Sequence, residues 1–340
     1  DFIIKNINYI SNSNIKLLRL VLPIGISFYT FQGLSYIVDV YKKDAKVCRS
    51  FVDFATYVCL FPQLIAGPIV RYTTIEDELK NRTHSFDKFA YGVNRFVVGL
   101  AKKVILANNL GMLVDIMTKS NEKSVLSYWT VAIFFSLQIY YDFSGYSDMA
   151  IGLGRMFGFD FLENFNYPFI SKSIKEFWRR WHISLSSFFR DYVYIPLGGN
   201  RVSRGRWIFN LLIVWSLTGL WHGDSWNFIL WGLYFALLLI IENLFLQNIL
   251  SKLPALIQHI YAKFFIIISF VIFNNENIKD LWSSLYNMFN FRGLDLYNDF
   301  STYYLKSYTV LLIVSVIGAT PILKNIIQKI NKNVTGQKVI

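Results

Sequence analysis

Long apolar runs limit the folds open to this chain more than any other feature. Apolar side chains dominate residues 207–221, 225–246 and 255–273, which carry almost no charge. A helix needs about 20 apolar residues to cross the roughly 30 Å hydrocarbon core of a bilayer. Further runs of this kind occupy residues 15–40, 125–141 and 303–323. We therefore predict an all-α polytopic membrane protein.

The composition agrees with a membrane protein. Charged residues make up 16% of the chain and hydrophobic residues 54%, whereas soluble domains carry about 25% charged residues. The net charge of +12 would suggest nucleic acid as a partner of a soluble protein. Here the basic residues lie mostly between apolar runs, so we expect them to face anionic membrane lipid and predict no nucleic-acid partner. Cys48 and Cys59 offer neither a disulfide framework nor a zinc set.

The distribution of charge predicts an orientation. Residues 171–206 are rich in Lys and Arg, residues 274–302 form an acidic loop, and the tail 324–340 has lysines and no acid. Cytoplasmic loops carry the excess of Lys and Arg in membrane proteins. With residues 171–206 in the cytoplasm, the hairpin 207–246 crosses out and back, the acidic loop lies outside and the tail ends inside.

The N-terminal part departs from simple spans. Residues 1–15 are polar and predict a loop, and Pro23 and Gly25 predict a kink in the run 15–40. The apolar run 51–72 is short and interrupted by prolines and glycine. Broken helices at membrane depth usually line a cavity or are buried in protein. This run is either a re-entrant half-span or an ordinary kinked span.

The middle of the chain combines apolar and polar signals. Residues 89–117 have a helical period that Lys102 and Lys103 interrupt. We expect this helix to lie partly at the interface, with both lysines reaching toward water. The span 125–141 runs into a Gly-rich stretch, 142–159, where we expect a break in the helix.

A polar cluster marks the expected break. Its members are Asp142, Ser144, Tyr146, Ser147 and Asp148. Ser and Asp side chains satisfy free backbone N–H groups, so the cluster fits the caps of two helix ends that face each other. It fits equally the lining of a polar tunnel, and the two interpretations do not exclude each other.

Most of the candidate chemistry lies in residues 175–232. Apolar side chains from Phe177 to Phe188 recur at helical spacing and predict a basic helix that carries His182. The following segment, 194–200, has the Pro and Gly–Gly composition of a turn.

Two histidines in this region are candidate site residues. His222 ends the apolar run 207–221 and lies between Gly219 and Gly223. An imidazole there can take a proton from an attacking hydroxyl near neutral pH; the alternative is a buried histidine that only bonds a carbonyl. His182 is either a polar tunnel residue or a packing residue. Neither has an acidic or Cys ligand at a recognisable spacing, so we predict no metal site.

The arginines of the basic helix are candidates for binding an anionic donor. A guanidinium pairs bidentately with phosphate, and Arg179, Arg180 and Arg190 lie in or just after this helix. Their number is explained equally well by cytoplasmic topology and lipid headgroups. The chain has no P-loop, dinucleotide-binding fingerprint or Gly-x-Ser-x-Gly nucleophile.

Long motifs in these segments resemble one family. The resemblance rests on KEFWRRWHISLSSFFRDYVYIPLGGNR (175–201) and SLTGLWHGDSWNFILWG (216–232), with further matches in residues 61–72 and 141–159. These motifs are similar to those of the membrane-bound O-acyltransferases, in particular the bacterial branch that O-acetylates alginate, peptidoglycan and other wall polysaccharides. The resemblance implies a helical bundle with tilted and re-entrant helices around a transmembrane tunnel.

The resemblance also implies roles for individual residues. The catalytic histidine of the family falls on His222, and its second histidine on His182. The implied donor substrate is acetyl-CoA, which we expect to dock near Arg179, Arg180 and Arg190, and no bound cofactor is expected. We assign the tunnel wall to Trp178, Trp181, Asp191, Tyr194, Asn200, Trp221, Asp142 and Ser144.

We expect a single membrane-embedded domain over residues 1–340, with its catalytic core in 175–232. The family usually has further spans at both ends, so we expect the chain to be truncated there. The resemblance implies a multi-pass protein of the bacterial cytoplasmic membrane, an extracytoplasmic SGNH-type transferase as partner and an envelope polysaccharide as acceptor. Two alternatives stay open, namely D-alanyl transfer to teichoic acid and non-catalytic transport of a polysaccharide or lipid.

Overall fold

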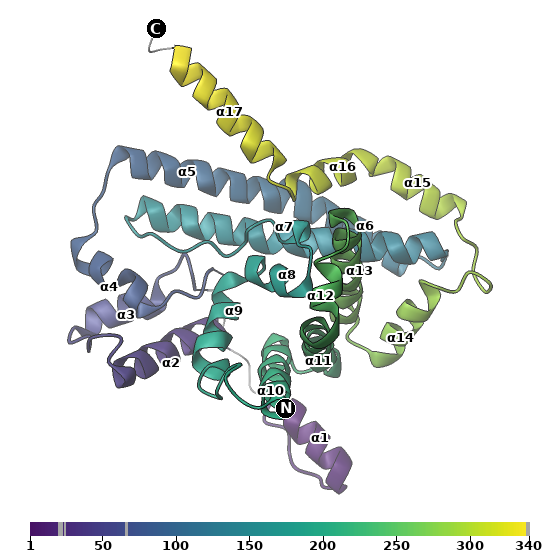
Figure 1. The fold of residues 1–340 in the computed structure, drawn as a ribbon, viewed down its shortest axis with the longest axis horizontal. Helices are drawn as coiled ribbons and strands as arrows, with labels where there is room; N and C mark the ends of the chain where they lie inside the picture. The colour runs from purple at the N-terminus through teal and green to yellow at the C-terminus, as the bar shows by residue number, and fades with distance from the viewer. Residues whose placement is uncertain (20–22, 24, 65–66, 338–340) are drawn as a thin grey trace.

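The computed structural model describes residues 1–19, 23, 25–64 and 67–337. In this part of the chain all regular structure is helical and no strand occurs (Figure 1). Helices suit a bilayer because each backbone N–H and C=O is bonded within its own segment. The all-α prediction is confirmed.

The longest helices form one layer. α5 (Phe86–Ala101) continues through the π-helical segment η1 (Lys102–Ala107) into α6 (Asn108–Lys119). This rod lies alongside α7 (Val125–Met156), as Figure 1 shows. The interruption expected at Lys102 and Lys103 is therefore a local change of helix type, and the rod continues past it.

Glycines allow α5 and α7 to approach closely. A Cβ added at Gly92 would lie 2.6 Å from the carbonyl oxygen of Gly152. A Cβ added at Gly145 would lie 2.8 Å from the carbonyl oxygen of Gly99. Membrane helices gain packing in this way because small residues let their backbones meet.

α7 runs without a break through the polar cluster, so the break expected at 142–159 is wrong. Two of the glycines that suggested a break, Gly145 and Gly152, lie at the contact with α5 instead. Two carboxylates of the cluster have partners on η1, where Lys103 pairs with Asp142 and Lys102 with Asp148. The cluster therefore does not cap facing helix ends.

The second half of the bundle begins with a helical hairpin. α10 (Arg204–His222) and α11 (Trp226–Ile241) pack against each other, and α11 continues through η4 (Glu242–Leu246) into α12 (Gln247–Leu250). α13 (Ala255–Asn274) packs on α11 and α7. This arrangement brings α7 and the hairpin to either side of one interior space.

Aromatic side chains join α8 (Ile174–Arg180) to the hairpin. The ring of Trp178 lies 4.5 Å from that of Trp215 and 4.9 Å from that of Phe235, centroid to centroid. Trp231 adds a further edge contact to Phe235 at 5.2 Å. Edge-to-face pairs of this kind contribute about 0.5–1.5 kcal/mol each beyond their burial.

Three helices in the described part of the chain are long and apolar enough to cross a membrane, namely Phe86–Lys119, Trp226–Leu250 and Ala255–Asn274. A fourth is obtained if α15 (Asp299–Ser307) and α16 (Thr309–Gly318), which are bent by 54° at their junction, count as one span. This pair covers most of the span predicted at 303–323.

The other predicted spans do not meet this measure. Residues 125–141 and 207–221 are helical, but α7 and α10 carry more polar side chains. In the run 15–40 the described helix is α2 (Ile26–Lys42), which follows Gly25 at a positive φ of 76°. Residues 20–22 and 24 of that predicted span lie outside the described residues.

The loop predicted for residues 1–15 is wrong over most of its length, because residues 2–11 form helix α1 (Phe2–Ser11). The many Asn and Ser residues made this segment look like a loop, although its apolar residues recur at helical spacing. The ring of Phe2 lies 5.6 Å from that of Trp226, and Trp226 Nε1 donates a hydrogen bond to Asn6 Oδ1 at 3.1 Å. The helix thus contacts the start of α11.

The apolar run 51–72 contains a short helix, α3 (Phe51–Cys59), before a turn and an extended segment that leads to α4 (Tyr72–Asn81). Residues 65–66 lie outside the described residues. A helix of nine residues is too short to cross a bilayer. The described part of this run is therefore not an ordinary kinked span.

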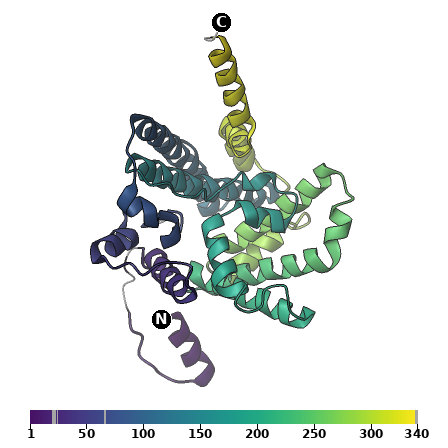
Figure 2. The ribbon, with the colours of Figure 1, turned by 60° about the vertical axis from the view of Figure 1, so that its left-hand side comes forward.

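The C-terminal region is more helical than predicted. The expected loop 274–302 contains α14 (Ile278–Asn287), which the Asn277 side chain caps and which buries Leu281. Residues of the expected tail form α17 (Ile322–Gln337), which projects away from the bundle in Figures 1 and 2. The sequence showed the charge of these segments but not their local helix signals.

Candidate active site

The basic helix predicted to carry His182 is interrupted at this histidine. α8 ends at Arg180, and α9 (Ile183–Phe189) and the π-helical segment η3 (Arg190–Tyr194) follow. Between α8 and α9, His182 has a positive φ of 43°. Left-handed backbone does not continue a right-handed helix. The prediction of one helix through His182 is therefore wrong, and two short helices meet at this residue.

Asn164 anchors the break. Its side-chain Oδ1 accepts hydrogen bonds from the backbone N–H of Ser184 at 3.1 Å and from the Ser184 hydroxyl at 3.0 Å. Its backbone carbonyl accepts from the N–H of Ile183 at 3.0 Å. Oδ1 also lies 3.2 Å from Nδ1 of His182. The sequence did not point to Asn164, because it lies in an ordinary loop, 162–169.

Asn164 also determines which nitrogen of His182 carries the proton. The Ser184 N–H can only donate, so the atom that faces it is the amide oxygen, and that oxygen can only accept from His182 Nδ1. A neutral imidazole with its proton on Nδ1 has its free lone pair on Nε2. This Nε2 is buried and has no hydrogen-bond partner within the described residues.

His222 is the last residue of α10 and lies in an aromatic surround. The centroid of its ring is 4.7 Å from that of Trp221, 4.8 Å from that of Trp231 and 5.2 Å from that of Phe273. The ring is only partly exposed. These apolar neighbours limit the water that reaches the imidazole.

Both histidines line one cavity of about 370 Å³. Side chains from seven elements or junctions line it: Phe28, Lys103, Ile139, Asp142, Phe143, Tyr146, Met149, Trp181, His182, Trp221, His222, Trp231, Phe270 and Phe273. Of the predicted site residues, His182, His222, Trp181, Trp221 and Asp142 meet here. The cavity lies between α7, the α8–α9 break and the α10–α11 hairpin.

Lys103 lines the cavity. From its sequence context we expected it at the membrane interface. It forms an ion pair with Asp142, and Lys102 pairs with Asp148 at 2.6 Å. Both lysines pair with carboxylates on α7, and Lys103 keeps 42% of its side-chain surface exposed. The expectation that the lysines reach toward water stays a prediction. Nothing in the sequence signals the π-helical segment that presents both lysines to α7.

The other predicted tunnel residues lie elsewhere. Ser144 is buried in α7 away from the cavity lining, and Trp178 and Tyr194 line a second cavity. Asp191 belongs to a network of charges, and Asn200 is exposed in the turn before α10. Within the residues that the structure describes, His, Cys, Asp and Glu form no group of three or more suited to a metal ion.

The three arginines predicted to bind the donor separate in space. Arg179 and Arg190 line the second cavity, which has a volume of about 450 Å³. Arg180 does not line it and instead pairs with Glu176 at 2.9 Å and donates to the carbonyl of Asn166 at 3.1 Å. Two of the three arginines therefore line a common space.

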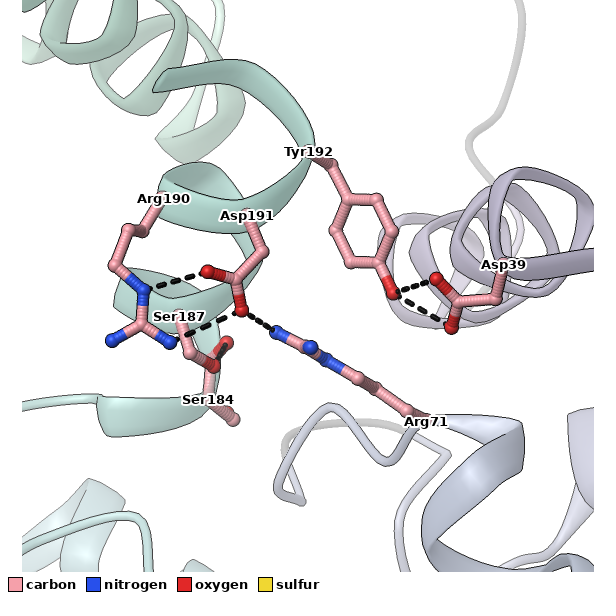
Figure 3. A network of polar contacts seen from close by, with 7 residues as sticks. All are labelled: Asp39, Arg71, Ser184, Ser187, Arg190, Asp191 and Tyr192. Carbon is pink, nitrogen blue, oxygen red and sulfur yellow. Dashed lines mark hydrogen bonds and ion pairs between the residues drawn. The ribbon is translucent and has the colours of Figure 1, made fainter. Parts of the chain in front are cut away.

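Asp191 holds two arginines together (Figure 3). Its carboxylate accepts from Arg190 Nε at 2.6 Å and from Arg71 at 2.6 Å, while the neighbouring Tyr192 hydroxyl donates to Asp39 at 2.7 Å. Burial opposes the ionisation of Asp191, but the hydrogen bonds from Arg190 and Arg71 outweigh it and hold the pKa of this carboxyl below its ordinary value. The network ties the segments around α2 and α4 to η3.

Comparison with known proteins identifies the family of this chain. Residues 47–279 match the model of the membrane-bound O-acyltransferase family. The chain is 46% identical over 273 residues to the probable alginate O-acetylase AlgI of Azotobacter vinelandii, covering 80% of this chain and 55% of that protein. It is 35% identical over 327 residues to the peptidoglycan O-acetyltransferase of Helicobacter pylori, covering 87% and 62%.

A more distant relative has a different acyl group in its name. The chain is 33% identical over 240 residues to the teichoic acid D-alanyltransferase of Bacillus subtilis, covering 67% of this chain and 60% of that protein. The chain belongs to the membrane-bound O-acyltransferase family. It spans about half the length of the alginate relatives that it matches. Its family and its span-capable helices make it a multi-pass membrane protein.

Proposed function

We propose that this chain carries the acyl-transfer site of a membrane O-acetyltransferase. The enzyme would move an acetyl group from cytoplasmic acetyl-CoA across the bacterial cytoplasmic membrane for O-acetylation of an envelope polysaccharide. The observation that carries this proposal is the single cavity lined by His182 and His222 in a member of this family. Relatives named for the O-acetylation of alginate and of peptidoglycan support acetyl as the group transferred.

In this proposal His222 is the general base. An acceptor hydroxyl gives its proton to the imidazole and attacks the thioester carbonyl, and the thiol leaves with a proton returned by His222. His182 contributes the lone pair of Nε2 as a hydrogen-bond acceptor that orients a group in the cavity. The aromatic lining of Trp181, Trp221 and Trp231 protects the thioester from hydrolysis by excluding bulk water.

The second cavity is our proposed approach of the donor. Arg179 and Arg190 face it, and guanidinium groups suit the phosphates of acetyl-CoA. Arg180 does not line this cavity and is bonded to Glu176 and Asn166, so its part in donor binding is the smaller one. The basic segment 171–206 faces the cytoplasm in the orientation that its charge predicts, which is the side on which acetyl-CoA occurs.

We propose that an SGNH-type transferase outside the cytoplasm is the partner that passes the acetyl group to the polysaccharide. The final acceptor, reached through this partner, is an envelope glycan hydroxyl, with alginate and peptidoglycan as the first candidates because of the relatives' names. Cells that lack the partner should keep the membrane protein at its usual level and lose glycan O-acetylation.

D-alanyl transfer is the second candidate, since one relative is named for it. The two reactions differ in their donor, which is acetyl-CoA in one case and an aminoacylated carrier protein in the other. Cell envelopes that retain the partner transferase, supplied with radiolabelled acetyl-CoA and no carrier protein, should incorporate label into glycan. Label that appears only with a charged carrier protein and D-alanine would favour the second candidate.

The deciding experiment compares His222→Ala with the unchanged full-length protein in its own cells. We expect the O-acetyl content of one envelope glycan to fall to background while the variant accumulates normally in the membrane. His84→Ala is the control, because His84 lies outside the cavity. Normal acetylation by the His222 variant would remove this residue from the mechanism and favour non-catalytic transport.

A further inference from the structure

The histidine cavity contains one fixed ion pair. Among the described residues that line it, Lys103 is the sole Lys or Arg and Asp142 the sole acid. The two side chains pair with each other, and 42% and 43% of their surfaces are exposed. An ammonium group has three N–H donors, and its described hydrogen bond to Asp142 uses one. The remaining donors are available to a molecule in the cavity.

The local backbone explains why Lys103 reaches this position. Successive residues of an α-helix point about 100° apart, whereas the π-helical segment η1 inserts an extra residue in its turn. Lys102 and Lys103 therefore both reach carboxylates on α7, namely Asp148 and Asp142. Gly145 brings the two backbones together beside them. Insertions of this kind are frequent at functional sites.

Lys102 and Lys103 differ in what they face. Both lie on η1 and both pair with an aspartate of α7, but only Lys103 and its partner line the histidine cavity. A role confined to holding η1 on α7 predicts at least as large an effect at Lys102, because its pair with Asp148 is the more buried of the two. A chemical role in the cavity is open to Lys103 alone, so the neighbouring residue is a built-in control.

We propose that Lys103 is a catalytic residue, the group that stabilises the oxyanion of the transferred acetyl group. This inference rests on the proposed function. The acceptor hydroxyl gives its proton to His222 while its oxygen forms a bond to the thioester carbonyl carbon. The electron pair of the C=O double bond moves to the carbonyl oxygen, and the Lys103 ammonium donates a hydrogen bond to that negative oxygen.

The second half of the step restores every group. The oxyanion re-forms the C=O bond and expels the thiolate of CoA, which takes the proton from His222. Lys103 neither gains nor loses a proton, and its ammonium returns to Asp142. A positive charge held in place beforehand stabilises the oxyanion because little reorganisation is needed when the negative charge develops. Asp142 keeps the ammonium at the cavity when it is empty.

The test uses membranes that contain the full-length protein, radiolabelled acetyl-CoA and the envelope fraction of the same cells. We expect Lys103→Met to lower kcat about 100-fold or more, as loss of one oxyanion donor does in other acyl transfers, with little change in KM for acetyl-CoA. Lys103→Arg should recover most of the lost rate, since it restores the charge. Lys102→Met should stay within about threefold of the parent, because Lys102 lies outside the cavity lining and Asp148 keeps its ion pair with Arg95.

Three results would overturn the inference. The first is a Lys103→Met variant with the parental kcat. The second is an equal loss of kcat in Lys102→Met and Lys103→Met. The third is a Lys103→Met variant that changes only the KM for acetyl-CoA. If Lys103→Met does not accumulate, Lys103→Gln replaces it, because an amide still bonds Asp142 but brings no charge, and the same kcat loss is expected. A parent protein that transfers no label would instead contradict the proposed function on which the inference rests.

Discussion

His182 Nδ1 lies 3.2 Å from Oδ1 of Asn164, and this contact joins the loop before α8 to the break between α8 and α9. Because the same oxygen already accepts from Ser184, the ring must donate from Nδ1 and present its lone pair at Nε2. The two histidines of the cavity thereby receive different tasks, with His182 as a hydrogen-bond acceptor and His222 as the base.

Replacement of Asn164 should disturb this arrangement. In Asn164→Ala the N–H groups of His182 and Ser184 lose their acceptor inside the protein, which costs about 1–3 kcal/mol for each group left unpaired. We expect a lower Tm in detergent and a kcat reduced by about tenfold or more, because the orientation of His182 is lost. Asn164→Asp keeps an acceptor oxygen and should retain more activity than the alanine variant. Equal losses in the two variants would argue against the hydrogen bond as the cause.

The close contact of α5 and α7 makes a stability prediction. A Cβ at Gly145 would lie 2.8 Å from the backbone oxygen of Gly99, so Gly145→Ala must push the helices apart. Overpacking of this kind costs about 1–3 kcal/mol, and Tm in detergent should fall accordingly. Gly33→Ala on α2 is the control, because its Cβ meets nothing within 4 Å and Ala favours a helix by about 1 kcal/mol. A stable Gly145→Ala protein would mean that the helices are farther apart.

The Asp191 network should show a particular dependence on pH. The folded pKa of Asp191 lies below its ordinary value, so the unfolded chain binds this proton first as the pH falls. The stabilisation is therefore complete above the unfolded pKa of about 3.9 and is lost as the pH falls from there toward the folded pKa. The Tm difference between the parent and Asp191→Asn should be constant from about pH 7 to pH 5 and shrink below about pH 4.

The exposed pair of Asp115 with Lys119 supplies the comparison for this titration. Asp115→Asn should change Tm little at any pH, because solvated ion pairs contribute about 0–1 kcal/mol. A Tm difference for Asp191→Asn that grows as the pH falls would contradict the predicted direction.

The separation of the arginines predicts different effects on the donor. Arg179→Ala removes a guanidinium from the second cavity and should raise KM for acetyl-CoA by about tenfold, since a charge-assisted hydrogen bond contributes about 1.5–3 kcal/mol. Arg180→Ala should affect KM less, because this side chain is bound to Glu176 and Asn166. Steady-state kinetics with varied acetyl-CoA would separate the two. A larger KM effect at Arg180 would move the donor site away from the second cavity.

Several features of the site followed from local sequence. The apolar runs predicted the helices α10, α11 and α13, and the motifs alone singled out His182 and His222. These predictions succeed because apolar length and unusual polar residues next to apolar runs are local properties. The resemblance to the family rested on the same local motifs and is confirmed by the match over residues 47–279.

Other features could not be predicted because they depend on distant partners. The glycines and polar residues of 142–159 suggested a break, whereas contact with α5 and η1 keeps α7 continuous. The helix predicted through His182 is broken because Asn164, in a loop, bonds the backbone N–H groups of the two residues that follow this histidine. Lys103 has the sequence context of an interfacial residue, and only the fold brings its partner Asp142 beside it.

The sequence by itself determined that this is an all-helical membrane protein and which two histidines are its candidate site residues. Apolar run length and motif spacing carry that information without reference to distant residues. Only the tertiary structure decided that His182 and His222 line one cavity, that Arg180 is separated from Arg179 and that Lys103 lines the same cavity. These relationships depend on where helices cross and on which buried charges pair, and packing between segments far apart in the chain sets both.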